Sequence, residues 1–293
     1  MTILPSSPDD LHRHRKMAES FGDDPARYDR TRPTYPAALV DRIVAAGPGR
    51  DLLDVGIGTG ISARLFAAAG CEVLGVEADE RMAAFARRAG SKVEVATFEA
   101  WDPAGRTFDT VIAGQAWHWV EPVAGAAKAA RVLRPGGLFA AFWNVHQPEL
   151  AAAEAFGEIY GRLVPEAPQF YRASMGADRT FAAFREPTER GLRAAGDVFG
   201  EPEFWLFDWD RRYTRDEWLD VVPTHGGHSL LPPERLAELL SSLGAAIDEL
   251  GGSFDAHFTT VAVTATRFPS SPVRGEPNDP PAPKVPAPTD RER

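Results

Sequence analysis

A glycine-rich turn directly after a short apolar strand is the feature that most constrains this chain of 293 residues. Residues 52–60 read Leu-Leu-Asp-Val-Gly-Ile-Gly-Thr-Gly, and a helix is predicted to begin at Ile61. Glycines at alternate positions permit a tight backbone turn and allow a ligand to approach the main chain closely. The free N–H groups at the start of the helix would face that ligand. The pattern therefore predicts a nucleoside-binding strand–turn–helix unit.

The spacing of these glycines distinguishes between nucleoside cofactors. The fingerprint of dinucleotide-binding enzymes is G-x-G-x-x-G, and its third glycine would fall where this chain has Ile61. Here the spacing is G-x-G-x-G, preceded by Asp54. Glu77 ends the second predicted strand, where a carboxylate can accept both ribose hydroxyls of an adenosine. Because dinucleotide enzymes also use an acid there, Glu77 supports a nucleoside without choosing the cofactor.

Strands and helices are predicted to alternate through the first half of the chain. The predicted strands span residues 52–55, 72–76, 92–96, 108–113 and 137–143, with helices over 61–69, 79–88 and 120–133 between them. Such alternation is typical of an α/β fold with a doubly wound parallel sheet. After residue 144 the pattern is mainly helical and irregular, before a late strand over 204–209, a helix over 214–222 and a last strand over 258–266.

The pattern divides the chain into five expected parts. They are an N-terminal cap segment (1–45), a cofactor-binding core (46–146), a helical cap insertion (147–203), strands and helices that complete the core (204–268) and a proline-rich tail (269–293). The tail holds eight prolines in 25 residues and little that could form a core, so we expect it to be disordered and to take no part in chemistry.

Composition narrows the expected partners and compartment. The formal net charge of −10 opposes a general affinity for nucleic acid backbone. Cys71 is the single cysteine, which excludes an intramolecular disulfide and fits a reducing compartment. No stretch is apolar enough for a signal peptide or a membrane span. We therefore expect a cytoplasmic monomer or homodimer that acts on a small molecule, with no nucleic acid or membrane partner.

Four segments together resemble a known family. Residues 52–60 are similar to motif I of the class I S-adenosylmethionine-dependent methyltransferases, residues 114–119 resemble a Q-A-F-H-W segment, and residues 131–137 resemble an R-V-L-K-P-G-G turn. Residues 28–36 match the pattern Y-x-x-x-R-P-x-Y-P. The chain thus resembles the methyltransferase type 11 group and, within it, the trans-aconitate methyltransferase-like members. The resemblance implies a Rossmann-like sheet of seven strands, mostly parallel, whose last strand runs antiparallel, with a helical substrate cap.

The same resemblance implies that S-adenosyl-L-methionine is the cofactor and S-adenosyl-L-homocysteine the product. Phe98 and Glu99 would flank the adenine, and Tyr28 would close over the methionyl end. The cofactor-binding residues that it implies are Tyr28, Arg32, Asp54, Gly56, Gly58, Thr59, Gly60, Glu77, Ala78, Met82, Thr97, Phe98, Glu99, Gln115, Ala116 and Trp119.

Candidate residues for the methyl acceptor are fewer. His118 is the candidate catalytic base, and the alternative is that it only shapes the cofactor site between two tryptophans. Arg27, Arg30 and Arg32 are candidates to bind an anion, either on the acceptor or on the cofactor. The predicted substrate-binding residues are Tyr35, Trp143, His146, Tyr171, His225 and His228. His225 and His228 lie three apart without further ligands nearby in the sequence, so no metal site is expected.

These observations predict an enzyme that transfers a methyl group to a small molecule, with an oxygen acceptor favoured over nitrogen or carbon. A carboxylate acceptor is ionised at pH 7 and needs no base, whereas an alcohol or phenol benefits from one. A non-catalytic S-adenosylmethionine-binding protein is the alternative, and a nicotinamide-dependent oxidoreductase is a weaker one. A methyltransferase acting on tRNA or protein is disfavoured by the acidity of the chain.

Overall fold

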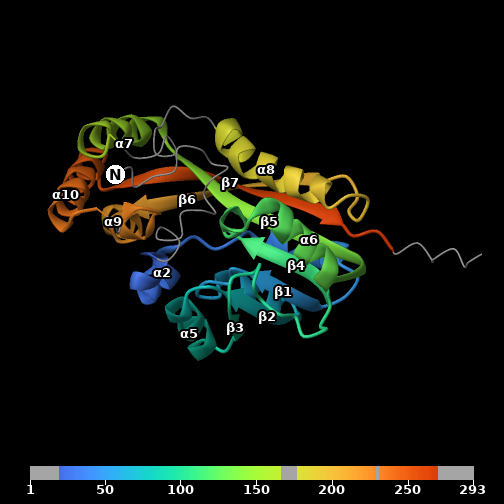
Figure 1. Ribbon diagram of the computed structural model, residues 1–293. Helices are drawn as coiled ribbons and strands as arrows, with labels where there is room; N and C mark the ends of the chain where they lie inside the picture. The colour runs from blue at the N-terminus through green and yellow to red at the C-terminus, as the bar shows by residue number, and fades with distance from the viewer. Residues whose placement is uncertain (1–19, 166–176, 229–230, 270–293) are drawn as a thin grey trace, which may run out of the picture.

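A seven-stranded sheet runs through the computed structural model, which describes residues 20–165, 177–228 and 231–269, with only the backbone for 177–180 (Figure 1). The strand order is β3-β2-β1-β4-β5-β7-β6. The strands are β1 (Asp51–Val55), β2 (Glu72–Glu77), β3 (Lys92–Val95), β4 (Phe108–Gly114), β5 (Leu133–Pro148), β6 (Glu203–Thr214) and β7 (Ser253–Thr266).

Strands β1 to β5 pair in parallel, and β7 pairs antiparallel with both β5 and β6. Consecutive parallel strands need a crossover connection, because one strand ends at the opposite end of the sheet from where the next begins. This arrangement confirms the predicted α/β, doubly wound, mostly parallel sheet with an antiparallel last strand.

The helices of the described residues cover both faces of the sheet (Figure 1). The α-helices are α2 (Pro25–Thr31), α3 (Ala37–Ala46), α4 (Ile61–Ala68), α5 (Glu80–Arg88), α6 (Pro122–Val132), α7 (Leu150–Leu163), α8 (Ala177–Ala194), α9 (Arg215–Val221) and α10 (Pro233–Glu249). Short 3-10 turns are η2 (Phe21–Asp23), η3 (Trp117–Trp119) and η5 (Val222–Thr224).

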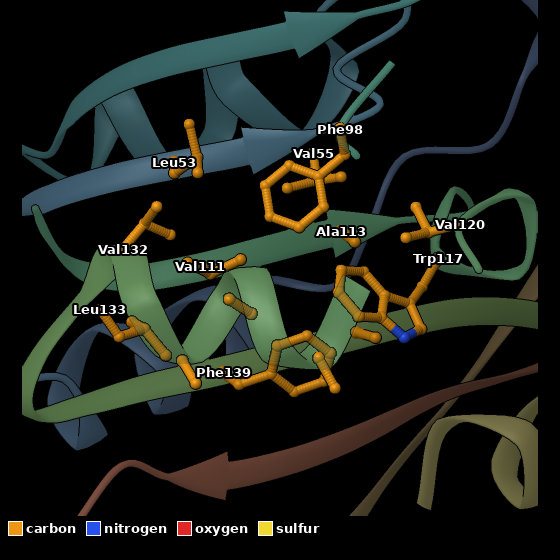
Figure 2. Close-up of a cluster of buried hydrophobic side chains, with 14 of the residues drawn as sticks. Leu53, Val55, Phe98, Val111, Ala113, Trp117, Val120, Val132, Leu133 and Phe139 are labelled. Atoms are coloured by element: carbon orange, nitrogen blue, oxygen red, sulfur yellow. The ribbon is translucent and has the colours of Figure 1, made fainter. Parts of the chain in front are cut away.

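Alternation of side chains along the strands builds a core on each face of the sheet. Leu52 in β1 is buried with α3 and α4, whereas its neighbour Leu53 is buried on the opposite face with α6. Figure 2 shows the second of these cores, where Leu53 and Val111 from the strands lie beside Val132 at the end of α6. The glycine-rich turn is thus held between two packed layers.

A further core forms where β6 and β7 extend beyond the parallel strands. We call it the distal core, and its central residues are Phe156, Tyr160, Tyr213, Trp218, Leu239, Leu243, Phe254 and Phe258. It joins α7, α9 and α10 to one end of the sheet (Figure 1). The last three strands are longer than predicted, because their extra residues pack against these helices instead of lying in loops.

The expected cap insertion of residues 147–203 separates into two differently packed helices. Helix α7 packs with α10 in the distal core, and α8 lies along α6 on one face of the sheet (Figure 1). Gly191 in α8 is so close to α6 that an added Cβ would lie 2.2 Å from the carbonyl oxygen of Pro122. Of the two helices in this insertion, only α7 belongs to the distal core.

The N-terminal segment contains a seven-residue helix, α2, that the sequence did not predict. Its N-cap is Asp24, whose carboxylate accepts from the Arg27 amide at 2.9 Å, and Pro25 occupies the first turn. The helix ends at Arg32, which has an extended backbone (φ −65°, ψ 138°) because Pro33 disfavours a helical residue before it. The prolines and charged residues of this segment thus keep α2 short but do not prevent the helix from forming.

Candidate functional site

The glycine-rich turn connects β1 to α4 at the carboxyl edge of the parallel strands. Gly56, Gly58 and Gly60 all have positive φ, at 69°, 58° and 91°. At Gly56 a second constraint applies, because an added Cβ would lie 2.5 Å from Cβ of Ala116. The turn therefore needs glycine for its backbone and also for its contact with the loop after β4.

Asp54 is buried directly beneath this turn. The hydroxyl of Ser62, in the first turn of α4, donates to Asp54 Oδ2 at 2.6 Å. The other oxygen, Oδ1, has no hydrogen-bond partner among the residues that the structure describes. Burial raises the pKa of Asp54 to about 7, an effect that the Ser62 bond opposes and the Glu77 charge increases. One buried carboxylate oxygen thus lacks a hydrogen-bond partner among the described residues, which is uncommon for a buried polar atom.

Glu77 lies across the turn from Asp54, at the end of β2. Its carboxylate accepts from the amide of Gly58 at 2.8 Å and from the amide of Asp79 at 2.9 Å. Burial raises the pKa of Glu77, and these backbone hydrogen bonds oppose the rise. Met82 of α5 packs beside Gly58, whereas Ala78 is exposed. The acid predicted from the sequence is therefore in contact with the turn.

The loop after β4 closes the other side of the turn. Gln115 has a φ of 54°, a left-handed conformation that is uncommon outside glycine. Its amide donates to the carbonyl of Phe142 at 2.8 Å, and its side chain donates to the carbonyl of Asn144 at 3.1 Å. These bonds hold a strained residue in place at the site, and Ala116 follows against Gly56.

His118 is half-buried in η3 and bonded to a neighbouring tryptophan. The indole N–H of Trp143 donates to His118 Nδ1 at 3.0 Å. Burial, and then the charge of Arg32, lower the pKa of His118 to about 3, so the ring is neutral. A neutral imidazole that accepts at Nδ1 carries its proton on Nε2. His118 therefore offers an N–H donor. Trp143 is only 1% exposed, so it does not line the site as predicted but fixes the tautomer of His118 by its hydrogen bond.

The residues after β3 do not all face the turn. Phe98 is buried and packs against Trp101 and Trp117 in the core (Figure 2). The carboxylate of Glu99 accepts from the Glu121 amide at the start of α6 at 2.8 Å. Thr97, a predicted cofactor-binding residue of the same loop, is half-buried and packs neither in this core nor against α6.

The N-terminal segment brings three predicted residues to the same region. The guanidinium carbon of Arg32 lies 5.1 Å from the centre of the Tyr28 ring. Tyr35 is buried edge-on against Phe142, with ring centres 4.7 Å apart, and burial raises its pKa well above the usual value. Phe21, which the sequence did not mark, contacts both Tyr28 and Trp119.

The three candidate arginines have different surroundings. Arg27 and Arg30 both pair with Asp220 of α9, at 3.0 and 2.8 Å. Arg32 is half-buried and has no carboxylate partner among the described residues, yet its charge lowers the pKa of His118, His146, His225 and His228. Arg32 is therefore the arginine that a ligand anion can reach with least competition.

Three histidines gather at the end of β5, on the side of the distal core; His228 is buried, and His146 and His225 are half-buried. His146 lies against His225, with ring centres 6.1 Å apart, and His225 against His228 at 5.7 Å. Burial, and then the charge of Arg32, lower the pKa of His146 to about 4 and that of His225 well below its usual value. Burial lowers the pKa of His228 to about 4, an effect that backbone hydrogen bonds oppose. His228 Nε2 lies 3.0 Å from the hydroxyl of Tyr160. Tyr171, the remaining predicted contact, lies outside the described residues.

Neither a metal cluster nor a membrane span is found in the described part of the chain. No group of three histidine, cysteine or acidic residues within 20–165, 177–228 and 231–269 is arranged to hold a metal ion. None of the helices in those ranges combines the length and the apolarity that crossing a bilayer requires.

Comparison with known proteins places this site in a recognised class. Residues 53–141 match the family model of the methyltransferase domain. The solved structure of an Anaeromyxobacter dehalogenans protein, described as a candidate type II methyltransferase, is 25% identical. It superposes with a TM-score of 0.58 over 81% of this chain and 99% of its own. Residues 53–141 therefore carry a methyltransferase domain of the S-adenosylmethionine-dependent class.

Individual relatives agree with this class. An uncharacterized methyltransferase of Mycobacterium tuberculosis (strain ATCC 25618 / H37Rv) is 35% identical over 150 residues, which are 50% of this chain and 61% of that protein. A Saccharomyces cerevisiae protein described as a probable S-adenosylmethionine-dependent methyltransferase is 30% identical over 42% of this chain and 46% of its own. The chain thus spans about three fifths of the mycobacterial relative, and the finer resemblance to trans-aconitate methyltransferases stays a prediction.

Proposed function

We propose that this protein transfers a methyl group from S-adenosylmethionine to an oxygen atom of a small molecule. The observation that carries the proposal is the buried, unpartnered oxygen of Asp54 beneath the glycine-rich turn. The methionyl end of S-adenosylmethionine carries an ammonium group, which can donate to such an oxygen. A nicotinamide dinucleotide has no ammonium group, and the spacing of its fingerprint is also absent.

The surrounding residues fit the remaining parts of that cofactor. We assign Glu77 to the ribose hydroxyls, Arg32 to the methionyl carboxylate and Tyr28 to the same end of the molecule. When bound, the cofactor supplies a sulfonium methyl that is already activated. The chain's own contribution is to hold the acceptor in line with that methyl and to exclude water. The loop of Gln115 and Ala116 bounds the site on the β4 side and helps to exclude water.

The ionisation of the histidines favours an acceptor that arrives already charged. His118, His146, His225 and His228 are all held neutral by burial and by Arg32, so their capacity to take a proton near pH 7 is small. His118 offers an Nε2–H donor that can orient an oxygen. We therefore assign it a positioning role in preference to that of a base. A carboxylate or an acidic phenol suits this environment better than an alcohol.

The cofactor assignment is tested by titration with S-adenosylhomocysteine and, separately, with NADH. We expect tight binding of the first and weak binding of the second. Glu77→Ala should weaken S-adenosylhomocysteine binding by about 1–3 kcal/mol, because hydrogen bonds to a charged group are lost. Glu72→Ala, at the exposed start of the same strand, is the matched control and should have no effect. Tight binding of NADH without S-adenosylhomocysteine would overturn the proposal.

Transfer itself is tested with cofactor labelled on the methyl group. The protein is incubated with this cofactor and small acidic metabolites extracted from cells, and mass spectrometry follows the label. Labelled methyl esters or ethers support oxygen transfer, and label on nitrogen or carbon contradicts it. Cofactor binding without any labelled product favours the non-catalytic alternative.

A further inference from the structure

Helix α2 is tied by ion pairs to two separate parts of the molecule. On one side, Asp29 accepts from Arg64 Nη2 at 2.7 Å, and Nη1 of the same arginine donates to the carbonyl of Thr59 in the glycine-rich turn at 3.0 Å. On the other side, Asp220 of α9 binds both Arg27 and Arg30. The helix therefore bridges the cofactor turn and the edge of the distal core.

Besides these ties, α2 is held by the contact of Tyr28 with Phe21 of η2. A helix of seven residues is too short to be stable by itself, and Thr31 is its single buried residue. Tyr28 of the helix lies against the guanidinium of the C-cap residue Arg32, 5.1 Å from ring centre to guanidinium carbon. Because Arg32 has no carboxylate partner among the described residues, its direction depends on the placement of the helix that ends at it.

We propose that Asp29 and Asp220 are positioning residues, which set the direction of Arg32 by clamping α2 from both sides. The inference rests on the proposed function, in which Arg32 binds the methionyl carboxylate. Neither aspartate is assigned a contact with the cofactor. Their effect on affinity passes through Arg32 alone and is therefore specific to ligands that carry the carboxylate.

The binding test compares S-adenosylhomocysteine with 5′-methylthioadenosine, which lacks the amino-acid end. Asp29→Ala and Asp220→Ala should each weaken S-adenosylhomocysteine about two- to five-fold, the range for partly exposed ion pairs. Binding of 5′-methylthioadenosine should not change. Since alanine is the best helix former, a loss cannot come from helix propensity. Asp216→Ala, on the same helix as Asp220 but paired only with its neighbour Arg215, is the matched control.

A double-mutant cycle separates positioning from general stabilisation. Arg32→Met alone should weaken S-adenosylhomocysteine about ten- to hundred-fold, as expected for a lost charge-assisted bond. In that background Asp220→Ala should cause no further loss. Additive losses would show that Asp220 acts independently of Arg32 and would overturn the proposal. Equal weakening of the binding of S-adenosylhomocysteine and of 5′-methylthioadenosine would also overturn it. Asp220→Glu should recover part of the affinity.

Hydrogen exchange of the free protein tests the clamp without any ligand. The amides of Tyr28 and Arg32 donate within α2, to the carbonyls of Asp24 and Tyr28 at 3.0 Å each. Both should exchange several-fold faster in Asp29→Ala and Asp220→Ala than in Asp216→Ala. If S-adenosylhomocysteine does not bind the unmodified protein, the proposed function fails, and exchange still decides on the clamp. Unchanged exchange with normal cofactor binding overturns the clamp alone.

Discussion

The charge state of Asp54 is the residue-level property with the most direct experimental signature. Burial in the free protein raises its pKa to about 7, so at pH 7 roughly half of the molecules carry a proton there. An ammonium group placed beside Oδ1 favours the carboxylate and lowers this pKa. Cofactor binding should therefore release a proton.

We expect calorimetric titration with S-adenosylhomocysteine at pH 7 to release up to about half a proton per site. The measurement compares two buffers of different ionisation enthalpy. Release should shrink at pH 9, where Asp54 is already ionised, and should be absent in Asp54→Asn. Release of the same size in that variant would assign the proton to another group.

Single residues differ in how far the sequence predicted them. Glu77 and the three glycines were predictable, because a turn that brings a ligand to the main chain restricts both residue type and spacing. The sequence did not predict the tautomer of His118, which depends on Trp143, 25 residues away. The core position of Phe98 was also missed, because the packing of a loop against α6 has no local pattern.

At the scale of elements, two glycines in helices α7 and α8 form a natural pair for testing packing. In α8, the Cβ of Gly191→Ala would meet the backbone of Pro122, so α8 must shift away from α6. We expect a loss of about 1–3 kcal/mol in the free energy of unfolding. In α7, Gly161→Ala meets nothing within 4 Å and should instead stabilise by about 0.5–1 kcal/mol.

Urea unfolding of both variants measures these opposite effects. Loss of stability in Gly161→Ala, or none in Gly191→Ala, would contradict the close packing of α8 on α6. Cofactor affinity provides a second measurement, because α6 follows directly after the 3-10 turn that holds His118. Gly191→Ala should lower it, and Gly161→Ala should not.

The parallel strands β1 to β4 and the helices α4 to α6 were predictable to within a residue or two, since short apolar strands alternate there with amphipathic helices. Strands β6 and β7 were predicted too short. Their outer parts, such as Tyr213 and Phe254, are buried by helices that the local pattern does not show. Helix α2 was missed because its contacts, among them the ion pairs with Arg64 and Asp220, are made with residues remote in the sequence.

At the scale of the whole molecule, the chain is fastened to the sheet as far as Phe268. The amide of Phe268 donates to the carbonyl of Val198 at 2.8 Å, and Arg267 exchanges backbone hydrogen bonds with Gly136 and Gly137. The proline-rich sequence that follows has little apolar content with which to add a core.

Deletion of residues 270–293 should leave both stability and cofactor affinity unchanged. We expect differences below about 0.5 kcal/mol, as for changes remote from packed features. Thermal unfolding and S-adenosylhomocysteine titration of the shortened and full chains measure this. A clear loss of affinity would assign the tail a role at the site and refute the expectation from its composition.

The extension of β6 and β7 beyond the parallel strands has a consequence for how such a protein can diversify. The sheet supports a core on each face and, beyond the parallel strands, the distal core, to which the glycine-rich turn does not belong. Phe156, Trp218 and Phe258 lie on α7, α9 and β7, so substitutions among them would change the packing of the distal core without altering the sequence of the glycine-rich turn. The two regions of the molecule can therefore be varied separately.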